Sequence, residues 1–118
     1  MGTRDVLTRE KCRPCEGIGK PLDAARIKEY LRQTPGWTVA SDEKSICREY
    51  AMENFMAAIR AINRVAEIAE AQGHHPDVHL TGYRKLRIVL TTHALGGLSR
   101  NDFIVAAKIN ALPMELKK

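Results

Sequence analysis

The longest helical pattern in the chain covers residues 55–72. Apolar side chains recur there at every third or fourth position, which is the spacing of a helix with one buried face. Those positions are Phe55, Ala58, Ile59, Ile62, Val65, Ala66 and Ala69. Asn54 is a good N-terminal cap, and Gly73 can adopt the left-handed conformation that often follows a helix end. The sequence therefore predicts one long amphipathic helix, around which shorter elements must be arranged.

Shorter elements are predicted on both sides of this helix. Capping residues and apolar periodicity indicate helices, and alternating runs indicate strands. The expected bounds are a helix at 23–33, strands at 37–40, 44–52, 78–83 and 85–92, and a helix at 99–112. The order α-β-β-α-β-β-α predicts an α+β fold: one domain, with a four-stranded antiparallel sheet and three helices packed on one of its faces.

The last predicted helix has little polar surface on any side. Its apolar residues are Phe103, Ile104, Val105, Ala106, Ala107, Ile109 and Ala111. A helix that is apolar nearly all round in so small a domain suggests a subunit interface. We therefore expect a homo-oligomer.

Residues 1–21 contain several glycine, proline and charged residues and show no sustained period, so we expect a flexible N-terminal arm before a folded domain at 22–118. Cys12 and Cys15 form a CxxC, a spacing that suits zinc or a redox pair. A structural zinc site needs two more ligands, and no second pair lies at a suitable distance. Whether these thiols bind a metal or lie idle in the arm stays open.

Charge and hydropathy narrow the class of protein. The net charge of +5 raises the question of nucleic acid, but the nineteen Lys and Arg residues are scattered and no aromatic platform lies among them, so no nucleic-acid partner is expected. No apolar stretch could span a bilayer, so no membrane partner is expected, and no secretory signal opens the chain. Three cysteines make a disulfide framework improbable. We expect a cytoplasmic protein.

Two adjacent histidines, His74 and His75, follow the long helix and precede Pro76. The proline restricts His75 to extended geometry, so the two rings are held in a defined turn. His93 follows the last predicted strand. Imidazoles can divide acid and base work near neutral pH, which makes these three histidines candidate catalytic residues. A metal site that also draws on Asp77 and His79 is an alternative, but adjacent residues on an extended chain point apart and suit one ion poorly.

Two carboxylates lie within reach of this group in the sequence. Glu70 precedes His74 by four residues and either orients a ring or is a solvated helix side chain. Asp102 lies three residues after Ser99, as in a capping box, so it either caps the last helix or also holds a site loop. Both alternatives stay open for both residues.

The chain resembles the pterin-4a-carbinolamine dehydratase family, most closely its bacterial and plastid-like members. The match lies in residues 70–77, Tyr83, residues 91–93, residues 97–99 and Asp102, and weaker similarity covers nearly the whole domain outside the N-terminal arm. The resemblance implies a metal-free and cofactor-free enzyme, a homodimer or homotetramer. It would remove water from 4a-hydroxytetrahydrobiopterin, giving quinonoid dihydropterin in tetrahydrobiopterin recycling.

The resemblance also implies roles for individual residues. His74, His75 and His93 match the family's catalytic histidines, with His74 and His93 favoured for proton transfer. The remaining matches are substrate-binding or supporting positions: Glu70, Pro76, Thr92, Ala94, Leu95 and Asp102.

One departure puts the natural substrate in doubt. Val78 stands where better-known members have an aromatic residue, so some stacking on the pterin is lost. A molybdopterin-related pterin is therefore an alternative substrate, and Arg87, which shares a strand face with His93 in this prediction, would favour a phosphorylated tail. A pterin-binding protein without turnover, or a dimerisation and transcriptional-coactivator module, are alternative functions.

Overall fold

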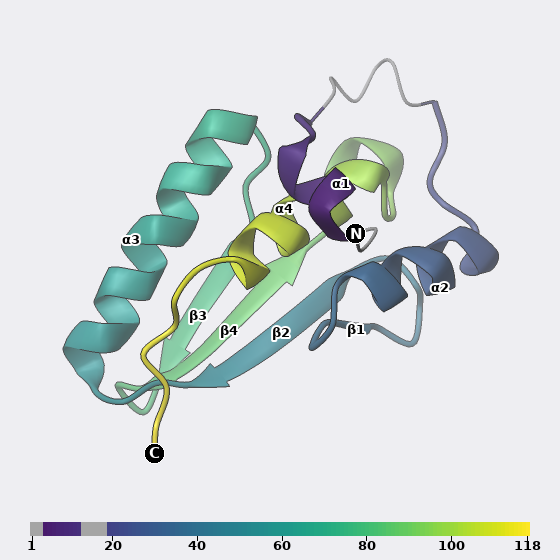
Figure 1. Cartoon of the computed structure of the whole chain (residues 1–118). Coiled ribbons are helices and arrows are strands. Elements are labelled where there is room, and N and C mark those ends of the chain that lie inside the picture. Colours follow the sequence, from purple (N-terminus) through teal and green to yellow (C-terminus); the bar gives the residue numbers. More distant parts are fainter. Residues whose placement is uncertain (1–3, 13–18) are drawn as a thin grey trace.

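The computed structural model describes residues 4–12 and 19–118, in which four strands form one antiparallel sheet of order β1-β2-β4-β3 (Figure 1). The strands are β1 (Thr38–Val39), β2 (Ile46–Ala51), β3 (Asp77–Thr81) and β4 (Lys85–Leu90). The helices are α1 (Arg4–Arg9), α2 (Ala24–Gln33), α3 (Phe55–Gln72) and α4 (Arg100–Asn110), with a short 3-10 helix η2 (His93–Leu95). The predicted α+β class is confirmed.

The long helix α3 begins and ends as the sequence predicts. The side chain of Asn54 accepts a hydrogen bond of 2.8 Å from the backbone N–H of Ala57. At the other end Gly73 has a φ of 64°, in the left-handed region, and its N–H donates to the carbonyl of Ala69. This sharp end turns the chain directly into the segment that carries His74 and His75.

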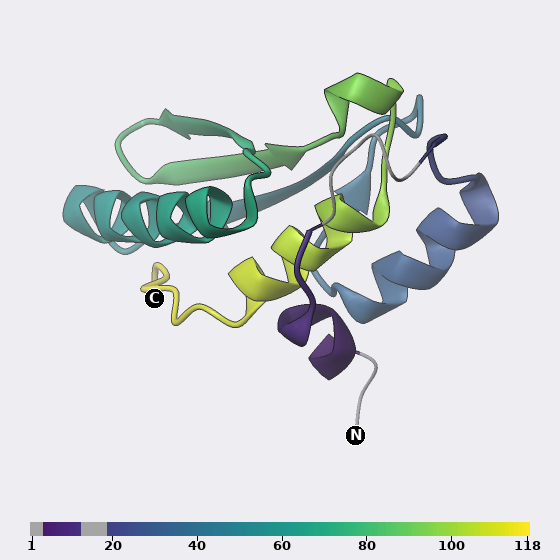
Figure 2. The same cartoon turned by 90° about the horizontal axis from the view of Figure 1, so that it is seen from above.

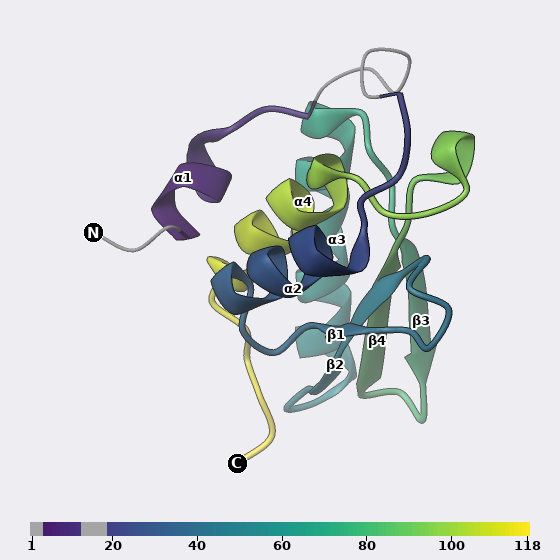
Figure 3. The same ribbon diagram turned by 90° about the vertical axis from the view of Figure 1, so that its right-hand side faces the viewer.

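The sheet has one covered and one open face. Leu86, Ile88 and Leu90 of β4 are buried on the covered face, where β2 contributes Ile46 and Tyr50. Figures 2 and 3 show α2, α3 and α4 together on that side, as predicted, and η2 on the opposite side. We call the face away from the helices the outer face. It carries the alternate residues of β2, β3 and β4.

Helix α4 is buried inside the chain, where it contacts α1, α2 and α3. All its apolar residues from Phe103 to Ala107, and Ile109 as well, are buried. The inference that this helix forms a subunit interface is therefore wrong, because its apolar surface is covered within one subunit. The expectation of an oligomer loses that support and stays a prediction.

Part of the predicted arm is folded. Residues 4–9 form α1, and the side chain of Leu7 is fully buried. Glu10 forms a two-pronged ion pair with Arg100 of α4. The expectation that this segment has no secondary structure is wrong. Val6 and Leu7 are adjacent among polar and charged residues and give no helical period, yet Leu7 is buried where α1 packs against α4. Cys15 lies outside the described residues, so the CxxC hypothesis stays untested.

Candidate active site

The three predicted histidines lie at the same end of the sheet. Asp77 at the start of β3 pairs with Val89, next to the last residue of β4. Because the two strands are antiparallel, the segment that precedes β3 and the segment that follows β4 lie beside each other. The first segment carries His74 and His75, and the second carries His93.

His74 is buried and hydrogen bonded to a buried carboxylate. Its Nε2 lies 2.6 Å from Oδ1 of Asp102, and both side chains are almost completely removed from solvent. A carboxylate can only accept, so Nε2 donates its hydrogen to Asp102 and Nδ1 is left to exchange a proton. The carboxylate also stabilises a positive charge on the ring, as in other carboxylate–histidine pairs.

Asp102 has three partners, which fix its position. Its Oδ2 accepts from the hydroxyl of Thr92 at 2.8 Å and from the backbone N–H of Ser99 at 2.9 Å. The hydroxyls of Thr92 and Ser99 are themselves 2.8 Å apart. The predicted capping residue of α4 therefore also orients a histidine. Asp102 thus caps the last helix and also holds the loop that carries His93, through Thr92.

His75 forms a second, more exposed pair. Its Nε2 is hydrogen bonded to Oε2 of Glu70 from the last turn of α3. Both side chains are more than half exposed. Glu70 is thus hydrogen bonded to His75 while it stays a largely exposed helix side chain, so both alternatives for it stay open. The half-buried Pro76 follows His75 directly.

His93 lies on η2 and not at a strand end as predicted. Strand β4 ends at Leu90, and Thr92 forms two backbone hydrogen bonds with Gly97, which close the intervening loop. His93 and Ala94 are exposed and Leu95 is half-buried. Since Thr92 also binds Asp102, the loop with His93 and the ring of His74 are fixed by the same carboxylate.

The alternative metal ligands do not gather. Asp77 and His79 lie on the outer face, since they pair with Val89 and Arg87 of β4. Among residues 4–12 and 19–118, no three or more His, Cys, Asp or Glu side chains are placed to hold a metal ion. The described site contains imidazole rings with carboxylate partners. Such groups can transfer protons.

Comparison with known proteins gives the family. The profile of the pterin 4 alpha carbinolamine dehydratase family matches residues 20–112. The chain belongs to this family. A protein of Halorhodospira halophila with the provisional name of pterin-4-alpha-carbinolamine dehydratase is 42% identical over 106 residues, which are 90% of this chain and 96% of that protein. The mitochondrial pterin-4-alpha-carbinolamine dehydratase 2 of Arabidopsis thaliana is 39% identical over 112 residues, 92% of this chain and 60% of the plant protein.

A solved member of the family has the same fold. The crystal structure of a transcriptional coactivator/pterin dehydratase from Brucella melitensis superposes with a TM-score of 0.73 and is 28% identical. The match covers 78% of this chain and 97% of the other. The dehydratase family assigned by sequence thus agrees with the fold.

Proposed function

We propose that this chain is a hydro-lyase that removes water from 4a-hydroxytetrahydrobiopterin or a close relative of it. The observation that carries the proposal is the bond between His74 and Asp102, placed at the same sheet end as His75 and His93. Membership of a family whose relatives are named pterin-4-alpha-carbinolamine dehydratases supports the same reaction.

The reaction needs two proton transfers on neighbouring atoms of the pterin. The hydroxyl on C4a takes up a proton and leaves as water when the C4a–O bond breaks. N5 loses its proton, and its electron pair forms the C4a–N5 double bond of the quinonoid dihydropterin. One imidazole accepts the N5 proton and another supplies the proton of the leaving water, so no net proton is consumed.

We assign some site residues to proton transfer and the others to orienting the histidines or holding the pterin. We assign the two proton transfers to His74 and His93, with His75 placing the ring or sharing a transfer. Asp102 and Glu70 orient His74 and His75 through the bonds described above. Pro76, Ala94 and Leu95 lie in the two segments that carry the histidines, and we assign them to contact with the pterin. The resemblance implies substrate binding for Thr92 as well, but its side chain is buried and its hydroxyl is bonded to Asp102, so we assign it to holding the loop that carries His93.

The proposal is tested by following the dehydration of chemically prepared 4a-hydroxytetrahydropterin. The wild type is expected to accelerate the reaction, and His74→Ala and His93→Ala are expected each to lose about 100-fold or more of that acceleration. Equal rates in all three proteins would exclude histidine catalysis. His75→Ala is expected to lose less, because its ring is exposed.

A second candidate function has one observation in its favour. The Brucella structure is titled a transcriptional coactivator as well as a dehydratase. A binding module needs an apolar contact surface, and Phe55 and Met56 at the start of α3 are 49% and 58% exposed. Protein variants at the histidines would lose dehydration and keep such binding, which separates the two functions.

The setting of the reaction is also proposed. We infer tetrahydrobiopterin recycling in the cytoplasm, by a homodimer or homotetramer, with no resident metal or cofactor and no nucleic-acid partner. No helix in the described part of the chain is both long and apolar enough to cross a membrane. The plant relative is named mitochondrial, so fractionation of cells that produce this chain tests the location.

A further inference from the structure

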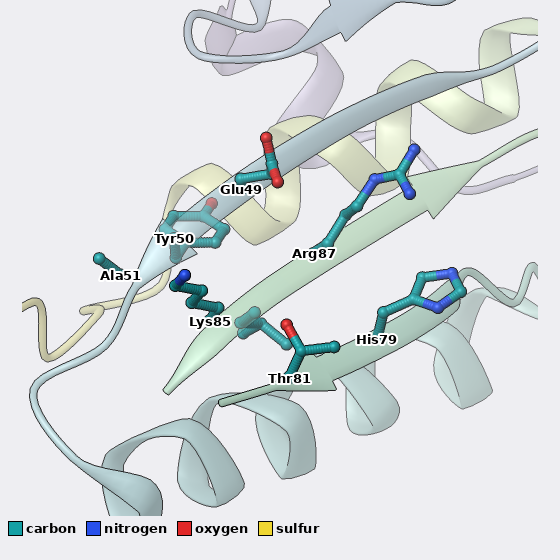
Figure 4. A pocket seen from close by; sticks show the side chains of 8 residues that line it. Glu49, Tyr50, Ala51, His79, Thr81, Lys85 and Arg87 are labelled. Atoms are coloured by element: carbon teal, nitrogen blue, oxygen red, sulfur yellow. The ribbon is translucent and has the colours of Figure 1, made fainter. Parts of the chain in front are cut away.

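The outer face of the sheet contains a hollow of about 510 Å³ that is not lined by His74, His75 or His93. Side chains of β2, β4 and β3 line it (Figure 4). Its outward-facing residues are Glu49, Ala51, His79, Thr81, Lys85 and Arg87. None of them has a part in the dehydration described above.

Strand register explains why a hollow forms here and what it offers. Arg87 on the central strand β4 has Glu49 and His79 as its neighbours on either side. One row further, Lys85 lies between Ala51 and Thr81, two small side chains that leave space above the sheet. The floor of the hollow thus contains Lys85 between two small side chains, and Arg87 lies beside it on the same face of β4.

Lys85 and Arg87 have no ion-pair partner in the part of the chain that the structure describes. Lys85 and Arg87 are exposed residues two positions apart on one face of β4, about 7 Å apart along the strand. Neither side chain has a hydrogen bond or ion pair with another residue of the described ranges, and Glu49 is the one carboxylate among the side chains that line the hollow. With the hydroxyl of Thr81 and the ring of His79, the hollow presents four donor groups to an anion.

The hollow is within reach of the histidine end. Thr91, the first residue after β4, lies four positions beyond Arg87, a distance of about 13 Å along an extended chain. In Figure 4 the side chains of Arg87 and His79 lean toward the end of β4, where the loop with His93 follows, and η2 stands on this same outer face. The row of paired residues between the hollow and the histidine end consists of Cys47, Val89 and Asp77.

We propose that the hollow around Lys85 and Arg87 is a subsite for an anionic group, of the phosphate class, at the end of the pterin's side chain. The inference rests on the proposed function, because the pterin ring must lie at the histidines. Its tail would then pass over Val89 and reach the hollow. The tail is attached at C6, next to the reacting N5, and so leaves the ring on the reacting side. Arg87 and Lys85 then select substrates by their tails without touching the reacting atoms.

Binding of stable dihydropterins tests the subsite without turnover. Two ligands with the same carbon tail, with and without a terminal phosphate, are titrated into the full chain by calorimetry. The phosphorylated ligand is expected to bind about tenfold more tightly, the gain of one charge-assisted hydrogen bond. Arg87→Gln is expected to abolish that difference, and Glu49→Gln to increase it. Arg32→Gln, an exposed arginine on α2, is the matched control and leaves the difference unchanged.

Each other outcome overturns the inference. Equal affinities for the two ligands in the wild type, or a preference that survives Arg87→Gln, would exclude the subsite. Inorganic phosphate that binds as tightly as the phosphorylated pterin would indicate a site for free anions and not for a substrate tail. Dehydration of the unphosphorylated carbinolamine, measured in parallel, reports on the proposed function, so the two failures are distinguishable.

Discussion

His74 and Asp102 are 28 positions apart in the sequence, yet their side chains share a hydrogen bond of 2.6 Å. The same carboxylate accepts from the backbone of Ser99 and the hydroxyl of Thr92. The first turn of α4 is therefore part of the candidate active site. Any change that shifts the start of this helix also shifts the histidine.

Replacement of this carboxylate tests its importance. Asp102→Asn keeps one acceptor oxygen but cannot satisfy His74, Thr92 and Ser99 together. The dehydration rate is expected to fall about 100-fold, the usual contribution of an oriented acid or base. The free energy of unfolding is expected to fall by about 1–3 kcal/mol, because charged hydrogen bonds are lost in a buried site. Stopped-flow absorbance and urea unfolding measure the two effects.

Ser99→Ala separates the capping role from the orienting role. It removes the side-chain cap of α4, at a cost of about 1 kcal/mol, and leaves the bond between His74 and Asp102 in place. The loss of rate is expected to be much smaller than in Asp102→Asn. Equal losses in the two variants would mean that Asp102 acts only through the helix.

The N-terminal helix is expected to contribute to stability. Leu7 is fully buried, so Leu7→Ala is expected to lower the free energy of unfolding by about 2–5 kcal/mol. Arg9→Ala changes an exposed neighbour in the same helix and is expected to stay within about 0.5 kcal/mol of the wild type. If denaturant unfolding gives the same value for both variants, α1 does not pack as described.

Tyr50 provides a test by alkaline pH. Its hydroxyl is buried without a hydrogen-bond partner in the described part of the chain, and burial raises the pKa of Tyr50 from its ordinary 10.0 despite the nearby Arg48 guanidinium, which lowers it. Tyr50→Phe is therefore expected to raise the free energy of unfolding by about 1 kcal/mol at neutral pH.

The raised pKa of Tyr50 also predicts how the free energy of unfolding changes with pH. Above pH 10 the unfolded chain releases the Tyr50 proton while the folded chain keeps it, so the wild type loses stability as the pH rises. Tyr50→Phe lacks this loss, and its advantage over the wild type grows from about pH 8 to about pH 11. A constant difference in urea unfolding across this range would contradict the buried hydroxyl.

The proposed oligomer is tested at the start of α3. Met56 is 58% exposed beside the exposed Phe55, which is unusual for large apolar side chains on one helix turn. Met56→Glu is expected to shift the chain from dimer or tetramer toward monomer in analytical ultracentrifugation. Ala25→Glu on the exposed surface of α2 is the control. If the wild type itself sediments as a monomer, the oligomer prediction is wrong.

Local signals account for what the sequence predicts well. The bounds of α3 follow from Asn54, the apolar period and Gly73, all within one segment. The two strand pairs follow from alternation and short turns in the same way. The capping role of Asp102 is also local, since Ser99 lies three residues before it.

Long-range packing accounts for what the sequence does not predict. Leu7 has no apolar neighbours at helical spacing, and its burial depends on α4. The bond from Asp102 to His74 depends on how α4 meets the end of α3. The hollow around Arg87 and Lys85 exists because β4 lies between β2 and β3 in the sheet. The alternation of apolar and polar residues predicts strands but not their order in the sheet.

The most direct test of this account compares the wild type with the double variant His74→Ala/His93→Ala on 4a-hydroxytetrahydropterin. Circular dichroism first establishes that the double variant is folded. We predict that the wild type accelerates the loss of water well above the spontaneous rate and that the double variant returns to that rate. A folded double variant that dehydrates the carbinolamine as fast as the wild type would contradict the proposed active site.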